Sequence, residues 1–151
     1  VDTATLNRIM RGLLSHVGVM PEGVRVVSKD QWELGNQMGV LKEDYLDTLD
    51  WMSEELEEEL GHDRARIPVD KKGARIMLTI NSKEPFAEPE DMFFWWKIFY
   101  AAKESWTVTS ENWEGVNWGL FTGDDDSMKE IVRRIVENYK KLECEYLLLP
   151  E

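Results

Sequence analysis

The last 78 residues alternate between strand patterns and helix patterns. The β-rich runs lie at 74–80, 106–109 and 146–149, and helical runs begin at Pro89 and Asp126. Strands that alternate with helices indicate a parallel sheet joined by right-handed crossovers. We therefore expect an α/β fold over residues 71–151, a three-layer-like parallel βαβαβ half-domain of Rossmann-like type. In such sheets a ligand sits beyond the carboxyl ends of the strands.

The first 70 residues predict a helical and extended arm, with a domain seam near 61–73. Apolar residues recur at helical spacing over 2–15 and predict a first helix. The segment 17–42 is rich in Gly and Pro, so we expect an extended arm with a short strand at 24–27. Residues 43–60 predict the clearest helix, which Gly61 caps. Its apolar stripe consists of Tyr45, Leu49, Met52, Leu56 and Leu60.

The helix predicted from Pro89 to about Ala102 is apolar almost all round. We expect such a helix to be buried on several sides or to meet another subunit, which allows a homodimer through this aromatic helix. Trp113 and Trp118 fall in the loop predicted before the last helix. Packing within the loop is the simpler interpretation of these two side chains; lining a cofactor pocket or a partner interface is the alternative.

The net charge of −12 disfavours nucleic acid and anionic lipid as partners, because both reward patches of Lys and Arg. Nine of the acids lie on the helix at 43–60, where they form a solvated face or an acidic docking surface. No apolar run reaches 18 residues, so we expect no membrane insertion. The single cysteine cannot form an internal disulfide, and this favours a reducing, cytoplasmic compartment.

No catalytic residue or metal site is predicted from the sequence. His16, His62 and Cys144 lack the spacing of metal ligands, and Cys144 is interpreted as a small buried hydrophobe. The turn at 123–126 opens a helix, but its three carboxylates would repel phosphate and are better explained as helix caps. We find no pairing of nucleophile and base.

Six short segments carry a resemblance that covers nearly the whole chain. They are GVMPEG at 18–23, GNQMG at 35–39, EDYLDT at 43–48, VDKKGAR at 69–75, NSKEP at 81–85 and GLFTGD at 119–124. In this order they resemble the heterodisulfide-reductase-like iron–sulfur subunit of the dissimilatory sulfite-reduction membrane complex. The resemblance implies a dicluster ferredoxin region followed by cysteine-rich "CCG" domains that bind a catalytic [4Fe-4S] cluster. It also implies electron transfer to a thiol/disulfide couple in sulfur respiration.

Within that family, the chain resembles the stretch after the ferredoxin region, including the first CCG-type half. The family places a cysteine after the first strand, Cys-Cys-Gly in the second loop and Cys-x-x-Cys after the third strand. Here Asn81 and Ser82 stand at the first place, and Asn117, Trp118 and Gly119 stand at the second. The third place lies just beyond residue 151. Cluster irons need thiolates, so we expect these positions to be degenerate and this chain to bind no cofactor.

Three functional hypotheses follow. The first is an internal segment of an iron–sulfur electron-transfer oxidoreductase, inactive alone and placed at the cytoplasmic face of a membrane complex. The second is a non-enzymatic scaffold that docks other subunits of a redox complex through its acidic helix and aromatic surface. The third is a free-standing α/β enzyme, for which a polar pocket at the tips of the strands at 74–80 and 106–109 would speak. We also expect the loop at 112–121 to lie beside the tip of the first strand.

Overall fold

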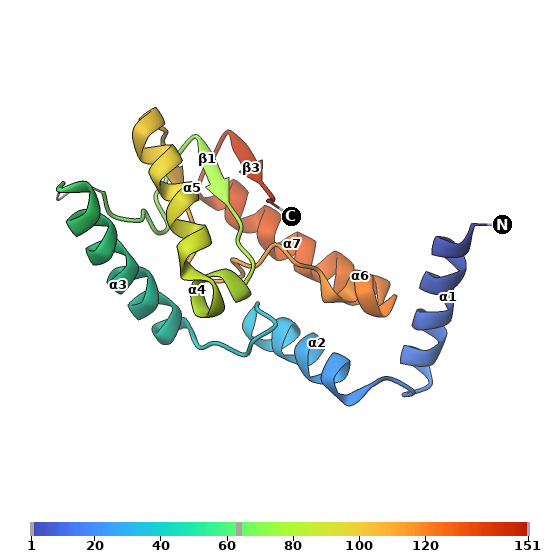
Figure 1. The fold of residues 1–151 in the computed structure, drawn as a ribbon. Coiled ribbons are helices and arrows are strands. Elements are labelled where there is room, and N and C mark those ends of the chain that lie inside the picture. The colour runs from blue at the N-terminus through green and yellow to red at the C-terminus, as the bar shows by residue number, and fades with distance from the viewer. Residues whose placement is uncertain (1, 63–64, 151) are drawn as a thin grey trace.

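The computed structural model describes residues 2–62 and 65–150, which are mostly helical and contain one small sheet (Figure 1). Three helices precede the first strand: α1 (Thr3–His16), α2 (Glu22–Leu34) and α3 (Lys42–Leu60). The remaining elements are β1 (Ile76–Leu78), α4 (Lys83–Ala87), α5 (Pro89–Ala102), β2 (Trp106–Thr107), α6 (Trp118–Thr122), α7 (Asp125–Lys141) and β3 (Tyr146–Leu148). No helix within the described ranges has both the length and the apolar character needed to cross a membrane.

The three strands form a parallel sheet in the order β2-β1-β3. Ile76 lies opposite Trp106 on one side and Tyr146 on the other. The prediction that the runs at 74–80 and 144–149 pair in parallel is therefore confirmed. The strands are short, and isolated parallel pairings, Val69 with Val108 and Ile80 with Glu114, extend the strand directions beyond them.

Alternate residues of the first strand face two separate cores, as the period of two along a strand requires. Leu78 and Ile80 pack in a core with α3 and α5, whereas Met77 packs in a second core with Ile131 and Ile135 of α7. The sheet is thus a thin layer between α3 and α5 on one face and α7 on the other.

The predicted apolar stripe of α3 faces the larger core, and so does one side of α5, which the sequence predicts to be apolar almost all round. In α3 four of the five stripe residues are buried, and Gly61 caps the helix with a φ of 63°. In α5 the residues Met92, Trp96 and Phe99 are buried, and the ring of Trp96 stacks on that of Trp106 with centroids 6.0 Å apart. The opposite side of α5 is bare, because Phe94 and Ile98 are 62% and 59% exposed.

The predicted extended arm at 17–42, with its strand at 24–27, is wrong, because α2 occupies most of that segment. Pro21 is the residue directly before the helix. A backbone N–H at that position has no partner within the helix, so proline, which lacks one, costs no hydrogen bond there. Gly35 ends the helix with a φ of 78°, a conformation that glycine adopts without strain. The Gly and Pro residues therefore mark the ends of a helix here instead of an extended chain.

The loops that follow β1 and β2 contain short helices that the sequence did not predict. Each of α4 and α6 has five residues, so Trp118 opens a helix instead of lying in a loop. The start of α7 agrees with the prediction, since the carboxylate of Asp124 accepts bonds from the backbone N–H groups of Asp126 and Ser127. The predicted capping role of this acidic turn is confirmed for Asp124, whereas Asp125 and Asp126 form ion pairs with Arg8 and Lys129.

Candidate functional site

The loops that leave β1 and β2 meet at the carboxyl edge of the sheet. The Ser82 hydroxyl, just after the first strand, donates to Glu114 Oε1 at 2.6 Å, and Ile80 pairs with Glu114 through the backbone. The prediction that the loop at 112–121 lies beside the tip of the first strand is therefore confirmed. The centre of the meeting point is the carboxylate of Glu114.

The Glu114 carboxylate is buried, with 1% of the residue exposed, and it accepts five hydrogen bonds. Gln31 Nε2 donates to Oε2 at 3.0 Å, and the backbone N–H of Gln37 donates to the same oxygen at 2.7 Å. Gln37 Nε2 at 2.8 Å and the backbone N–H of Ser82 at 3.3 Å donate to Oε1, beside the Ser82 hydroxyl. Within the described residues no cation pairs with this carboxylate, so neutral donors alone stabilise the buried group.

The two glutamines extend the network to Trp118. The side-chain oxygen of Gln31 accepts from the backbone N–H of Trp118, and that of Gln37 accepts from the indole Nε1, both at 2.8 Å. The Gln37 amide also donates to Asn81 Oδ1 at 3.2 Å. The donors and acceptors at this edge thus bond to one another. We call this group of packed polar side chains the plug; it consists of Gln31, Gln37, Asn81, Ser82, Glu114 and Trp118.

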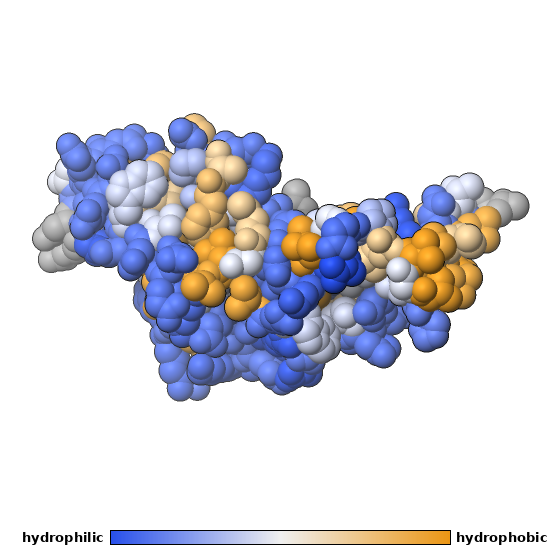
Figure 2. Space-filling view, turned by 90° about the horizontal axis from the view of Figure 1, so that it is seen from below, coloured by the Kyte–Doolittle hydropathy of each residue, from blue (hydrophilic) through white to orange (hydrophobic). Residues whose placement is uncertain are grey.

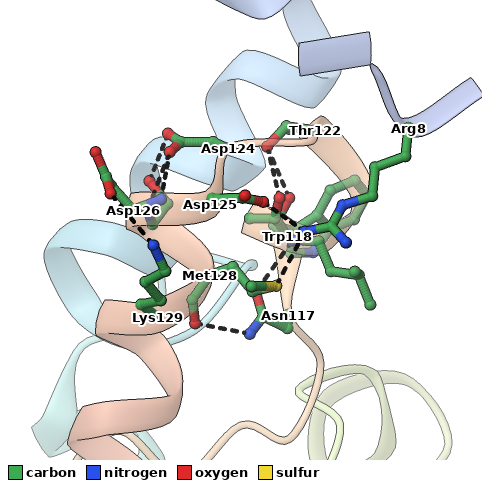
Figure 3. A network of polar contacts seen from close by, with 12 residues as sticks. Arg8, Asn117, Trp118, Thr122, Asp124, Asp125, Asp126, Met128 and Lys129 are labelled. Carbon is green, nitrogen blue, oxygen red and sulfur yellow. Dashed lines mark hydrogen bonds and ion pairs between the residues drawn. The ribbon is translucent and has the colours of Figure 1, made fainter. Parts of the chain in front are cut away.

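Asn117 and Gly119 join α6 to α7 (Figure 3). The Asn117 side chain accepts from the backbone N–H of Leu120, and its amide donates to the Met128 carbonyl at 3.1 Å. A Cβ at Gly119 would lie 2.2 Å from the backbone nitrogen of Met128. The residue at 119 is therefore glycine because two backbones touch there.

Of the five positions that the family pattern singles out, three lie in the plug and two lie beside it. Asn81, Ser82 and Trp118 belong to the Glu114 network, whereas Asn117 and Gly119 hold the two helices together. None of these side chains offers a thiolate, which an iron–sulfur cluster requires. A buried carboxylate at the centre would also repel an anionic cluster. The residues at this edge do not fit a [4Fe-4S] group.

The thiol of Cys144 lies at the other end of the sheet from the plug and cannot act as a ligand there. Cys144 precedes β3, whereas Ser82 follows β1, and in a parallel sheet these positions lie at opposite ends of the strands. Cys144 is buried, as predicted, and this burial raises the pKa of its thiol, so the thiolate is disfavoured. Among the described residues no group of three or more His, Cys, Asp or Glu side chains could hold a metal ion.

Three residues of the site carry no signal in the sequence: Gln31, Gln37 and Glu114. Gln31 lies in a segment without a motif, Gln37 lies in the GNQMG segment but no chemistry is predicted for it, and Glu114 is one of 30 acidic residues. Comparison of the chain with protein-family models, with curated proteins and with solved structures found no match.

Replacing Gly119 by alanine should lower the free energy of unfolding by about 1–3 kcal/mol, because the added methyl meets backbone atoms of α7 that cannot move aside. The matched control is Gly23→Ala in α2, where an added Cβ meets nothing within 4 Å. That variant should be as stable as the parent or more stable by up to about 1 kcal/mol. Urea denaturation followed by tryptophan fluorescence measures both; equal stabilities for the two variants would contradict the close contact.

Proposed function

We propose that this chain is a cofactor-free half-domain of an iron–sulfur electron-transfer oxidoreductase of the heterodisulfide reductase type. The redox assignment rests on the resemblance of six ordered segments, including NSKEP at 81–85 and GLFTGD at 119–124. In this proposal the parent protein acts on a thiol/disulfide couple in sulfur respiration and carries the [4Fe-4S] cluster elsewhere. The finer fold assignment, a Rossmann-like half-domain of CCG type, belongs to the same proposal.

One observation supports the cofactor-free role: the Glu114 network fills the edge where a parallel sheet usually receives its ligand. A cofactor loop needs donors that are free to turn toward the bound group. Here the donors of Gln31, Gln37 and Ser82 point at a carboxylate of the same chain. The role of the half-domain is then to join its neighbours within the redox complex and not to hold the cluster.

A second candidate function is a non-enzymatic scaffold that docks other subunits within a redox complex. The observation that favours it is the exposed apolar surface on α1 and on the outer side of α5. The acidic face of α3 offers a further docking surface for a cationic partner. Both proposals place the chain in the cytoplasm, and the first places it at the cytoplasmic face of a membrane complex.

Sequencing of the full-length transcript separates the two proposals. The redox proposal expects the reading frame to continue after residue 151 into a Cys-x-x-Cys segment that follows β3. It also expects a dicluster ferredoxin pattern upstream of residue 1. A stop codon directly after residue 151, or a continuation without cysteines, would contradict the redox proposal and favour the scaffold.

A further inference from the structure

An apolar cleft lies at the end of the molecule where α1, the start of α2 and α6 meet. The helix α6 contacts both α1 and α2, and the segment 19–21 between α1 and α2 forms a further wall (Figure 1). In Figure 2 hydrophobic side chains gather at this end of the molecule. The volume of the cleft is about 350 Å³, within the range of roughly 300–1,000 Å³ that small-molecule sites have. Most of its walls are apolar and include Leu14, Val19, Met20, Val24, Trp118 and Phe121.

Contacts within the chain fix the shape of this cleft. A Cβ at Gly12 would lie 2.9 Å from the carbonyl oxygen of Gly123, so α1 crosses the end of α6 with backbone against backbone. The Arg8 guanidinium pairs with the carboxylate of Asp125 at the start of α7 (Figure 3). On the other wall, Trp118 is held by its hydrogen bonds within the plug. The cleft is therefore formed before a ligand enters, which lowers the entropy cost of binding.

The polar groups that remain available in the cleft belong to α1. Arg11 and Ser15 both line the cleft and lie four residues apart, so they share one side of the helix. Within 2–62 and 65–150 the Arg11 guanidinium forms no ion pair or hydrogen bond, and the Ser15 hydroxyl forms no hydrogen bond. Thr122, the third polar residue of the lining, bonds instead to carbonyl groups of α6. One cation and one hydroxyl are thus free to meet a ligand.

The charge at the cleft is opposite to that of the chain. The chain has a net charge of −12, but α1 contains two arginines and no acid, and none of the described residues that line the cleft is acidic. Glu22 and Asp125, which lie close to the lining in sequence, are paired with Arg25 and Arg8. Exposed charges farther away than a Debye length of about 8 Å are largely screened at physiological salt. The local field of Arg11 therefore favours an anion.

The chemistry of the lining defines the class of that anion. A planar guanidinium matches a carboxylate in a bidentate geometry, whereas a cationic ligand would be repelled. A single cation balances a single negative charge. The apolar walls offer no further donors to a phosphate or a polyanion, but they cover a hydrocarbon body.

We infer that the cleft binds a small organic monocarboxylate with an apolar body, such as a medium-chain fatty acid. The carboxylate of the ligand pairs with Arg11 and accepts from the Ser15 hydroxyl, and the hydrocarbon body lies against Trp118 and Phe121. The ligand site is independent of the redox proposal, because it uses only α1, α2 and α6.

Equilibrium dialysis of the purified chain with octanoate tests the site, and octanol and acetate are the matched probes. We expect octanoate to bind once per chain with a dissociation constant below about 1 mM. Octanol has the apolar body without the carboxylate and should bind roughly three- to tenfold more weakly. Acetate has the carboxylate without the apolar body, so it should not bind at this concentration.

Variants of the lining assign the two parts of the ligand. Arg11→Gln should raise the dissociation constant of octanoate roughly three- to tenfold and leave that of octanol unchanged. Arg25→Gln is its control, because Arg25 pairs with Glu22 and does not line the cleft. Val24→Phe fills the cleft and should weaken both probes. Val26→Phe is its control on the same helix, because Val26 is exposed and lies outside the lining.

Three results would overturn the inference. The first is a failure of octanoate to bind at up to about 1 mM. The second is a lack of selection for the anion, seen as octanol binding as tightly as octanoate or as Arg11→Gln without effect on octanoate. The third is a dimer in sedimentation velocity that Val24→Phe abolishes, because a second copy of the chain would then fill the cleft.

Discussion

Replacing Glu114 by alanine should lower the free energy of unfolding by about 2–4 kcal/mol, because buried donors lose their shared acceptor. The backbone N–H groups of Gln37 and Ser82 cannot turn to other partners. The Gln31 amide loses one of the bonds that hold α2 on the sheet edge and keeps those to the Val116 carbonyl and the Trp118 N–H. Urea denaturation followed by tryptophan fluorescence gives the free energy. Hydrogen exchange should show α2 opening before the sheet in this variant.

Two further variants sharpen this test. Glu114→Gln keeps the shape and one acceptor oxygen. The Ser82 hydroxyl can turn to accept from the new NH2 group, but the Ser82 backbone N–H and Gln37 Nε2 lose their acceptor, so we expect a loss of about 1–3 kcal/mol. Glu111→Ala is the matched control, since Glu111 lies in the same loop but forms an exposed ion pair with Lys42. It should change stability by less than about 1 kcal/mol. If Glu114→Ala were as mild as Glu111→Ala, the central role of the Glu114 carboxylate would be wrong.

The elements that the sequence predicts well are those whose signals are local and repeated. The apolar stripe of α3 recurs every three to four residues, and Asp124 stands where a capping side chain is needed. The parallel sheet follows from the alternation of helices with β-rich runs. Repetition over several turns makes such patterns hard to misread.

The sequence predicts α2 wrongly because glycine and proline residues can indicate either an extended segment or the two ends of a helix. Gly and Pro both break helices and mark their ends, and only the position of Pro21 and the left-handed backbone of Gly35 distinguish the cases. The helices α4 and α6 are too short for a periodic pattern, and α6 depends on the cap that Asn117 supplies.

For the candidate site, the sequence predicts where in the fold it lies but not which residues form it. The convergence of the loops after β1 and β2 follows from the topology of a parallel sheet, and the structure confirms it. The identity of the central group could not be foreseen. Glu114 bonds to residues that are 83, 77 and 32 positions away, and no local pattern indicates such partners.

The degenerate-site interpretation predicts that cysteines alone cannot restore a cluster at this edge. Asn117→Cys with Trp118→Cys should lower the free energy of unfolding by about 3–5 kcal/mol, since it removes a helix cap and a large, partly buried ring. Loss of the Trp118 indole also leaves the Gln37 side-chain oxygen without its hydrogen-bond donor. After anaerobic incubation with ferrous iron and sulfide, the variant should bind no cluster and show no visible absorption, because the remaining thiolate ligands are absent.

Phe121→Cys is the control for this experiment, because it places a thiol on the same short helix at a half-exposed position. It should remain closer in stability to the parent than the double variant, and it should also bind no cluster. A double variant as stable as the parent would show that Trp118 is not part of a packed plug. Stoichiometric iron with a cluster spectrum in the double variant would show that the edge still holds a cluster cavity, and the interpretation of Glu114 as its permanent filling would then fail.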